Sequence, residues 1–153
     1  MFDPAKGYPQ VVPYFRYQDS TSAVRWLVDV LGATEALVMT LPDGRVGHAE
    51  LTIGSAVVAV GLALEPALGL ETPITRRTLR TMTLVFVDDV DEVVAKATQY
   101  GGSVIDPPTD QPWGLRQAII SDPEGYLWEP SRHLRDVPPE CWGASQVGNL
   151  PGG

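Results

Sequence analysis

The sequence predicts an α+β protein that contains two copies of one module, each with the order strand, helix, strand, strand, strand. The first observation is that four turn-forming residues recur after 70 positions: Asp19 and Asp89, Gly32 and Gly102, Pro42 and Pro112, and Gly44 and Gly114. Glycine and proline constrain the backbone path, so this recurrence indicates that the chain follows one path twice. The second observation is that strand-like and helical segments follow the same order in both halves.

The first module is expected over residues 11–62, after an N-terminal extension of residues 1–10. Residues 11–17 are rich in β-branched and aromatic side chains, which favours a strand. A helix follows, with Ser20 or Ser22 as its N-cap and Gly32 as its stop signal. Turn residues then separate three strands, expected at residues 34–41, 45–53 and 55–62.

The second module is expected over residues 81–131, after a linker of residues 63–80 that is rich in proline, glycine and arginine. A strand at 82–87 leads into a helix that begins at Asp89 or Asp91 and ends at two glycines. The three strands that follow are expected at residues 103–106, 115–121 and 126–131. Residues 132–153 contain two adjacent prolines and a glycine-rich end, which indicates an ordered extension followed by a flexible tail.

The composition restricts the partners and the cellular compartment. The chain has 153 residues and a net charge of -8, which disfavours nucleic acid as a partner and favours cationic or neutral small ligands. The single cysteine, Cys141, excludes an intramolecular disulfide and a cysteine-cluster metal site. The sequence has neither a leader-like start nor a long apolar run, so we expect a cytoplasmic protein with no membrane partner.

Two stretches of the sequence resemble a known superfamily. The string FVDDVDEVVAKATQYGGSVIDPPTDQPWGLRQAIISDPEGYLWEP closely resembles the C-terminal module of the vicinal oxygen chelate (glyoxalase, bleomycin-resistance and dioxygenase) superfamily. The first half, PYFRYQDSTSAVRWLVDVLGAT followed by LPDGRVGHAELTIG, resembles its N-terminal module. The resemblance covers about residues 11–131. It implies paired βαβββ modules whose mixed sheets form a partly closed cup around a ligand cavity, usually in a homodimer.

The resemblance also implies where a metal would bind. Metal enzymes of the superfamily hold one divalent ion, such as Zn, Ni, Mn or Fe, with side chains from the first and last strand of each module. Here those four positions are Val12, Ala59, Met82 and Glu129, with Pro13 and Thr83 replacing Val12 and Met82 if the register is shifted by one. Only Glu129 offers an imidazole or a carboxylate. We therefore predict no metal and no other cofactor, with one divalent ion as the alternative.

The two histidines allow a different kind of site. His48 and Glu50 are two apart in a predicted strand, so they share a face and could chelate an ion or relay a proton. The plainer interpretation is a strand with polar groups on its solvent side. His133, beyond the last strand, is expected at the surface or at a dimer edge.

Aromatic residues and one carboxylate define the expected ligand cavity. A cup lined by Tyr14, Met82, Trp113 and Glu129 would accept a flat or amphipathic ligand, with the carboxylate holding a cationic group. Tyr14 and Trp113 could equally be packing residues. Glu129 could be paired with Arg116, could be a general base, or could have no role.

These observations lead to one main functional hypothesis and two alternatives. The first is a metal-free binding protein of the antibiotic-resistance type, which sequesters a small aromatic or cationic molecule. The alternative is a lyase, isomerase or dioxygenase of the same superfamily that uses Glu129 as a catalytic residue, with or without a metal. A third is a non-catalytic partner whose tail around Trp142 makes contacts.

Overall fold

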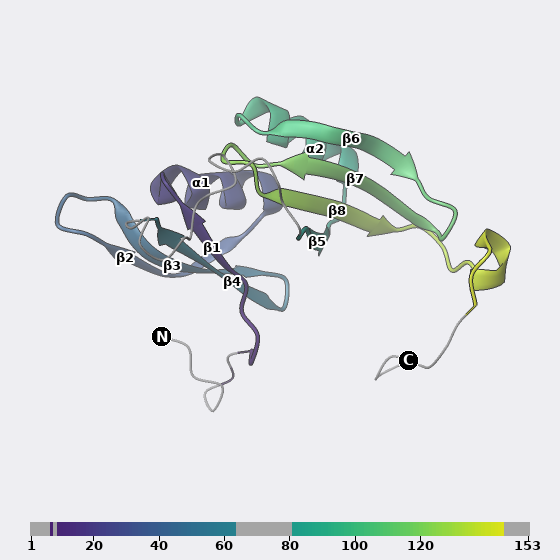
Figure 1. The fold of residues 1–153 in the computed structure, drawn as a ribbon, viewed down its shortest axis with the longest axis horizontal. Helices are drawn as coiled ribbons and strands as arrows, with labels where there is room; N and C mark the ends of the chain where they lie inside the picture. Colours follow the sequence, from purple (N-terminus) through teal and green to yellow (C-terminus); the bar gives the residue numbers. More distant parts are fainter. Residues whose placement is uncertain (1–6, 8, 64–80, 146–153) are drawn as a thin grey trace.

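A computed structural model gives the structure of residues 7, 9–63 and 81–145, and Figure 1 shows it as two mixed sheets with one helix each. This arrangement confirms the predicted α+β fold of two βαβββ modules. The predicted linker, apart from Ala63, and the end of the predicted tail lie outside the described residues.

The first module forms a four-stranded sheet in the order β1-β4-β3-β2. Its elements are β1 (Tyr14–Tyr17), α1 (Ser20–Leu31), β2 (Thr34–Thr40), β3 (Val46–Ile53) and β4 (Ala56–Leu62). Strand β1 runs parallel to β4, while the β2–β3 and β3–β4 pairs are antiparallel.

The second module repeats this topology in the order β5-β8-β7-β6. Its elements are β5 (Thr83–Phe86), α2 (Val90–Gln99), β6 (Ser103–Asp110), β7 (Leu115–Ser121) and β8 (Leu127–His133), followed by a 3-10 helix, Pro139–Trp142. Each element begins 69 to 71 residues after its counterpart, as the differences between paired start positions show (83−14, 90−20, 103−34, 115−46 and 127−56). The two halves of the chain therefore follow the same path.

Both helices start at an aspartate. The side chain of Asp19 accepts a hydrogen bond of 3.0 Å from the backbone N–H of Ser22, so the prediction of Ser20 or Ser22 as the cap was wrong. Asp89 caps α2 in the same way, through the N–H of Glu92 at 3.0 Å, as one of the two predicted starts. An aspartate carboxylate also favours the positive end of a helix, which explains its use at both starts.

Two strand boundaries differ from the prediction by three or more residues. Strand β1 begins at Tyr14 and not at residue 11. Strand β6 continues to Asp110, beyond the predicted end at residue 106, although it contains two prolines. This is possible because β6 is an edge strand and the prolines fall where its pairing with β7 shifts, between Asp106 and Thr109.

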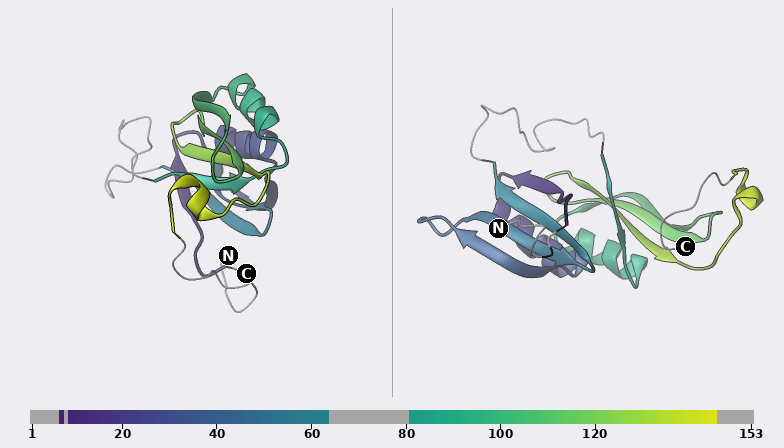
Figure 2. Two further views of the ribbon diagram at one scale, coloured as in Figure 1. Left: turned by 90° about the vertical axis from the view of Figure 1, so that its right-hand side faces the viewer. Right: turned by 90° about the horizontal axis from the view of Figure 1, so that it is seen from below.

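One apolar core runs through both modules. The rings of Phe15 in β1 and Trp128 in β8 lie 5.0 Å apart, and the buried residues of both modules belong to one continuous cluster. Helices α1 and α2 lie next to each other on one side of the molecule (Figure 2). Trp26 and Trp128 are both buried. The shared core fixes how the two sheets are placed relative to each other.

Both sheets remain open within the described residues. Strands β1 and β2 are the edges of the first sheet, and β5 and β6 are the edges of the second. The face of each sheet opposite its helix is thus available for side chains that do not belong to the core. No helix in the described ranges is long and apolar enough to cross a membrane.

Candidate functional site

Four polar side chains meet on the first sheet, on the face that does not pack against α1. Ala49 and Leu51 of β3 point into the core, so the residues that alternate with them point the other way. We call the resulting group the first-sheet cluster, and its members are Tyr14, Arg16, His48 and Glu50. The structure thus brings together three residues that the sequence singled out, plus Arg16.

The cluster is a continuous chain of hydrogen bonds. Nη1 of Arg16 donates to the hydroxyl oxygen of Tyr14 at 3.0 Å, and the same hydroxyl lies 3.1 Å from Nδ1 of His48. On the far side of the ring, Nε2 of His48 lies 3.4 Å from Oε1 of Glu50. The Arg16 guanidinium carbon also lies 5.2 Å from the centre of the Tyr14 ring, within the range of a cation–π contact.

Glu50 contradicts the interpretation of β3 as a strand with polar groups on its solvent side. The exposed fraction of Glu50 is 0%, although neighbouring His48 remains partly accessible. A buried carboxylate is costly unless polar groups surround it, and His48 supplies one such group. The pair therefore belongs to a protected polar site.

A glycine makes room for this cluster. Gly61 of β4 lies in register with Arg16 on one side and His48 on the other. A Cβ atom at this position would come within 2.5 Å of the Tyr14 hydroxyl oxygen and 2.9 Å of Nη1 of Arg16. Gly61 was not identified from the sequence, although a glycine inside a strand is itself a sign of close approach.

Glu129 lies on the corresponding face of the second sheet. In register it pairs with Leu84, which is 45% exposed, while Phe86 on the same strand is 65% exposed. Within the described part of the chain, no hydrogen bond or ion pair involves the carboxylate of Glu129. Arg116 instead binds Asp91 and Asp110, each at 2.7 Å, so the Arg116–Glu129 pair, one of the alternatives left open for Glu129, is contradicted.

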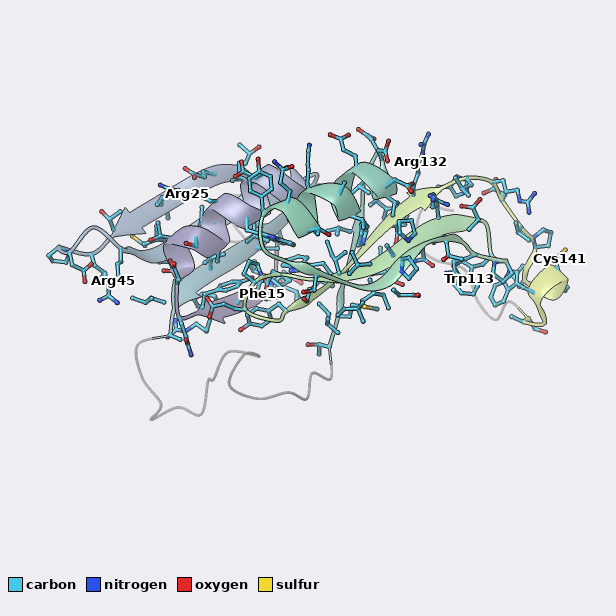
Figure 3. The ribbon with its side chains drawn as sticks, turned by 90° about the horizontal axis from the view of Figure 1, so that it is seen from above. Phe15, Arg25, Arg45, Trp113, Arg132 and Cys141 are labelled. Atoms are coloured by element: carbon cyan, nitrogen blue, oxygen red, sulfur yellow. The ribbon has the colours of Figure 1, made fainter. Side chains whose placement is uncertain are left out.

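Trp113 is connected to this face through two buried polar residues. Its Nε1 donates to Oε1 of Gln117 at 2.8 Å, and Nε2 of Gln117 donates to Oγ of Ser131 at 2.9 Å. Figure 3 shows Trp113 near the C-terminal 3-10 helix that carries Cys141, away from the module junction at Phe15. Sequence reasoning missed Gln117 and Ser131, although Ser131 is two residues from Glu129 and thus shares its face.

The six candidate residues therefore form two groups. Tyr14, His48 and Glu50 belong to the first sheet, whereas Glu129 and Trp113 belong to the second. Met82 directly precedes β5 and is also exposed, at the edge of the second sheet. His133 is exposed and contacts Asp136 at 2.9 Å, as expected for a surface residue.

The four metal-ligand positions implied by the resemblance do not form a suitable donor set. Ala59 lies beside Tyr14 in the first sheet, and Glu129 lies beside Leu84 in the second. As possible metal donors, these four residues offer one phenol and one carboxylate. Val12 and Met82, just before the two strands, have no nitrogen or oxygen in their side chains. No group of three or more histidine, cysteine, aspartate or glutamate residues in the described ranges could hold an ion. These residues do not fit the metal site of the superfamily.

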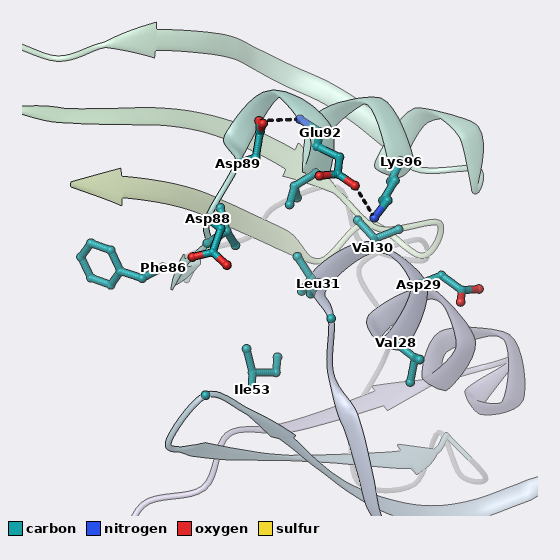
Figure 4. Close-up of a pocket in the computed structure, with 14 residues that line it drawn as sticks. Val28, Asp29, Val30, Leu31, Ile53, Phe86, Asp88, Asp89, Glu92 and Lys96 are labelled. Carbon is teal, nitrogen blue, oxygen red and sulfur yellow. Dashed lines mark hydrogen bonds and ion pairs between the residues drawn. The ribbon is translucent and has the colours of Figure 1, made fainter. Parts of the chain in front are cut away.

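Two hollows lie where the β3–β4 turn approaches β5. An apolar groove of about 420 Å³ is bordered by that turn and by Leu84, Phe86 and Trp128. The other hollow, of about 380 Å³, lies between the end of α1 and the start of α2 (Figure 4). Two of its carboxylates already have structural partners, since Asp89 caps α2 and Glu92 binds Lys96 at 2.7 Å. The apolar groove is therefore the better candidate for a ligand.

Comparisons with known proteins agree with this architecture. Residues 9–129 match the model of the Glyoxalase/Bleomycin resistance protein/Dioxygenase superfamily. An uncharacterized protein of Mycobacterium bovis is 28% identical over 138 residues, which cover 84% of this chain and 86% of that protein. The crystal structure of TioX from Micromonospora sp. ML1 is 34% identical, with a TM-score of 0.62 over 82% of this chain and 99% of TioX.

A second solved structure extends the likeness in fold. A glyoxalase/bleomycin resistance protein/dioxygenase family enzyme from Burkholderia phytofirmans PsJN is 19% identical, with a TM-score of 0.65 over 79% of this chain and 95% of that chain. At that identity the likeness concerns the fold alone. Since the family match spans both modules, the chain belongs to the glyoxalase/bleomycin resistance protein/dioxygenase superfamily.

Proposed function

We propose that this protein binds a small aromatic or cationic molecule without a metal ion, as a drug-sequestering member of its superfamily. The binding surface in this proposal, called the second-sheet surface, consists of Leu84, Phe86, Trp113 and Glu129. The observation that carries the proposal is the Glu129 carboxylate, which has no hydrogen-bond or ion-pair partner among the described residues and lies beside an exposed leucine.

The chemistry of this surface favours an amphipathic cation. Leu84 and Phe86 expose apolar area, and covering such area contributes about 25 cal/mol per Å². Glu129 would attract a positive group on the same ligand. The net charge of -8 adds a long-range attraction for cations and a repulsion for anions. The apolar groove beside Leu84 and Phe86 offers space for a ring system.

A homodimer is part of the proposal. Leu84 and Phe86 lie on the edge strand β5, where a second copy of the chain could cover the ligand and enclose the surface. We place the protein in the cytoplasm, where sequestration would protect the cell from a toxic molecule. Sedimentation velocity with wild type and Phe86→Lys tests the dimer, because a charge at this position would oppose burial.

The alternative function is that of a lyase, isomerase or dioxygenase of the same superfamily. It draws support from the same carboxylate, which is accessible enough to accept a proton from a substrate. The alternative requires turnover that Glu129→Gln abolishes. The binding proposal requires a stoichiometric complex that persists without chemical change in the ligand.

A ligand panel tests the proposal. Aromatic amines, quaternary ammonium dyes and neutral aromatic compounds are added to the full chain, and thermal unfolding and tryptophan fluorescence are recorded. The proposal predicts a higher melting temperature and quenching of Trp113, which is partly exposed, with the aromatic cations. The matched variants are Glu129→Gln and Glu35→Gln, which remove the same charge from the second and the first sheet. Equal responses of the two variants would contradict the proposal.

A further inference from the structure

We propose that Tyr14 is an activated phenol that transfers a proton to or from a small molecule on the first sheet. This role goes beyond the proposed binding function and concerns the other sheet of the molecule. It rests on the directed hydrogen-bond chain of the first-sheet cluster, which joins an exposed hydroxyl to a buried carboxylate.

The hydrogen bonds of the first-sheet cluster have one direction when Glu50 is a carboxylate and His48 is a neutral imidazole. Arginine only donates, so Nη1 of Arg16 gives a proton to the Tyr14 oxygen. A carboxylate accepts, so the Nε2 of His48 that faces Glu50 carries a hydrogen. Nδ1 of the neutral imidazole is then an acceptor, and the Tyr14 hydroxyl donates to it. Every donor in the chain thus points toward Glu50.

This direction is suited to removal of the Tyr14 proton. When the O–H bond of Tyr14 breaks, the proton forms a bond with Nδ1 of His48 and leaves a phenolate. Arg16 then stabilises the phenolate, and Glu50 stabilises the imidazolium, because each new charge has an opposite charge at hydrogen-bond distance. The phenolate takes a proton from the bound molecule, and the His48 proton passes to solvent.

The geometry also indicates the class of molecule. The reacting group must approach the hydroxyl of Tyr14, whose side chain is 48% exposed, and its conjugate base will lie near the Arg16 guanidinium. A conjugate base that carries its charge on oxygen suits this position. The expected class is therefore enolisable carbonyl compounds and phenols.

Tyr100 provides an internal comparison. It is 45% exposed, close to the 48% of Tyr14, but none of the described hydrogen bonds involves its hydroxyl. If Tyr14 only packs against the sheet, the two phenols should react alike. If the hydrogen bonds of the first-sheet cluster activate Tyr14, Tyr14 should react faster than Tyr100 at nearly the same exposure.

Labelling with benzenesulfonyl fluoride measures this difference. The phenol oxygen attacks sulfur, the S–F bond breaks, fluoride leaves and the phenol proton goes to His48. We expect Tyr14 to be labelled about tenfold faster than Tyr100, which corresponds to a barrier about 1.4 kcal/mol lower. Peptide mass analysis of the full chain gives both rates in one sample, and no ligand of Glu129 is needed. Failure of the ligand panel would therefore leave this result unaffected.

Three variants test whether the hydrogen bonds of the first-sheet cluster cause the difference in labelling rate between Tyr14 and Tyr100. His48→Gln and Glu50→Gln should each reduce the rate ratio toward one, with the fold checked by circular dichroism. Since Glu50 is buried and Glu50→Gln could unfold, Gly61→Ala is the third variant, because the three atoms nearest to the added Cβ belong to the side chains of Tyr14 and Arg16. Equal labelling of Tyr14 and Tyr100 in the wild type would overturn the proposal. An unchanged ratio in folded His48→Gln and Gly61→Ala would do the same.

Discussion

The hydroxyl of Tyr17 in β1 donates a hydrogen bond of 2.6 Å to Oδ2 of Asp122 in the β7–β8 turn. Both side chains are buried, and the bond joins the first module to the second. Oδ1 of Asp122 accepts from the backbone N–H groups of Glu124 and Tyr126 at 3.1 and 3.0 Å. The pair therefore fixes the turn and the module junction together.

Removal of the Tyr17 hydroxyl should weaken this junction. Tyr17→Phe leaves Asp122 buried with one donor fewer, and we expect a loss of about 1 to 3 kcal/mol in the free energy of unfolding. Urea unfolding followed by tryptophan fluorescence measures it. Tyr100→Phe is the control at an exposed position, with an expected change below about 0.5 kcal/mol. Equal effects of the two substitutions would show that the buried bond adds nothing.

Asp122 should also give the protein a distinctive pH dependence. Burial raises the pKa of Asp122 above its usual value, despite hydrogen bonds from Tyr17, Trp128 and the backbone. The folded state then holds this proton more tightly than the unfolded state. The Asp122 contribution is complete below the unfolded pKa of about 3.9 and is lost as pH rises through the folded pKa.

Asp122→Asn isolates that contribution, since all other carboxyl groups are shared with the wild type. The wild-type melting temperature minus that of the variant should be largest below the unfolded pKa of about 4 and should decrease as pH rises through the folded pKa. Thermal unfolding in a pH series provides the values. A difference that grows with pH would mean that the folded-state pKa of Asp122 is lowered.

The β6–β7 turn depends on a glycine with no room for a side chain. Gly114 has a φ of 89°, and a Cβ there would clash with the backbone carbonyl of Arg135. Gly143 has a similar φ of 84° but nothing within 4 Å. Gly143→Ala should thus show only the cost of a left-handed alanine, about 1 to 2 kcal/mol, and Gly114→Ala should cost more. Thermal unfolding of both variants compares them, and equal losses would contradict the clash.

Chelation should have little effect on this protein. The described residues at the superfamily's ligand positions include one carboxylate and no imidazole, so we expect no divalent ion to stabilise the fold. EDTA should leave the melting temperature unchanged, and elemental analysis should find no stoichiometric Zn, Ni, Mn or Fe. A melting temperature that falls with EDTA and recovers with one of these ions would contradict the prediction.

Much of the fold could be predicted because its signals are local. Glycines and prolines mark the turns, helical apolar spacing marks α1 and α2, and the 70-residue recurrence shows that the path repeats. The length of β6 could not be predicted, since prolines normally end a strand unless it is an edge with shifted pairing. Edge position is a property of the whole sheet and is not visible in the segment.

The candidate site was only partly predictable for the same reason. The shared face of His48 and Glu50 follows from strand alternation and needs no tertiary information. The contact between Tyr14 and His48 depends on the parallel register of β1 with β4, which only the folded sheet defines. Burial of Glu50 is also a tertiary property, and this is why the interpretation of a solvent-facing strand was wrong.

The most direct test of the central claim compares two ligands of the same shape. Calorimetric titration of phenyltrimethylammonium and its uncharged isostere tert-butylbenzene is carried out with wild type and Glu129→Gln. We predict that the wild type binds the cation more tightly, that Glu129→Gln reduces its affinity about fivefold to tenfold, and that the neutral isostere binds both proteins equally. An unchanged affinity of the cation in Glu129→Gln, or no binding of either ligand to the wild type, would contradict the account.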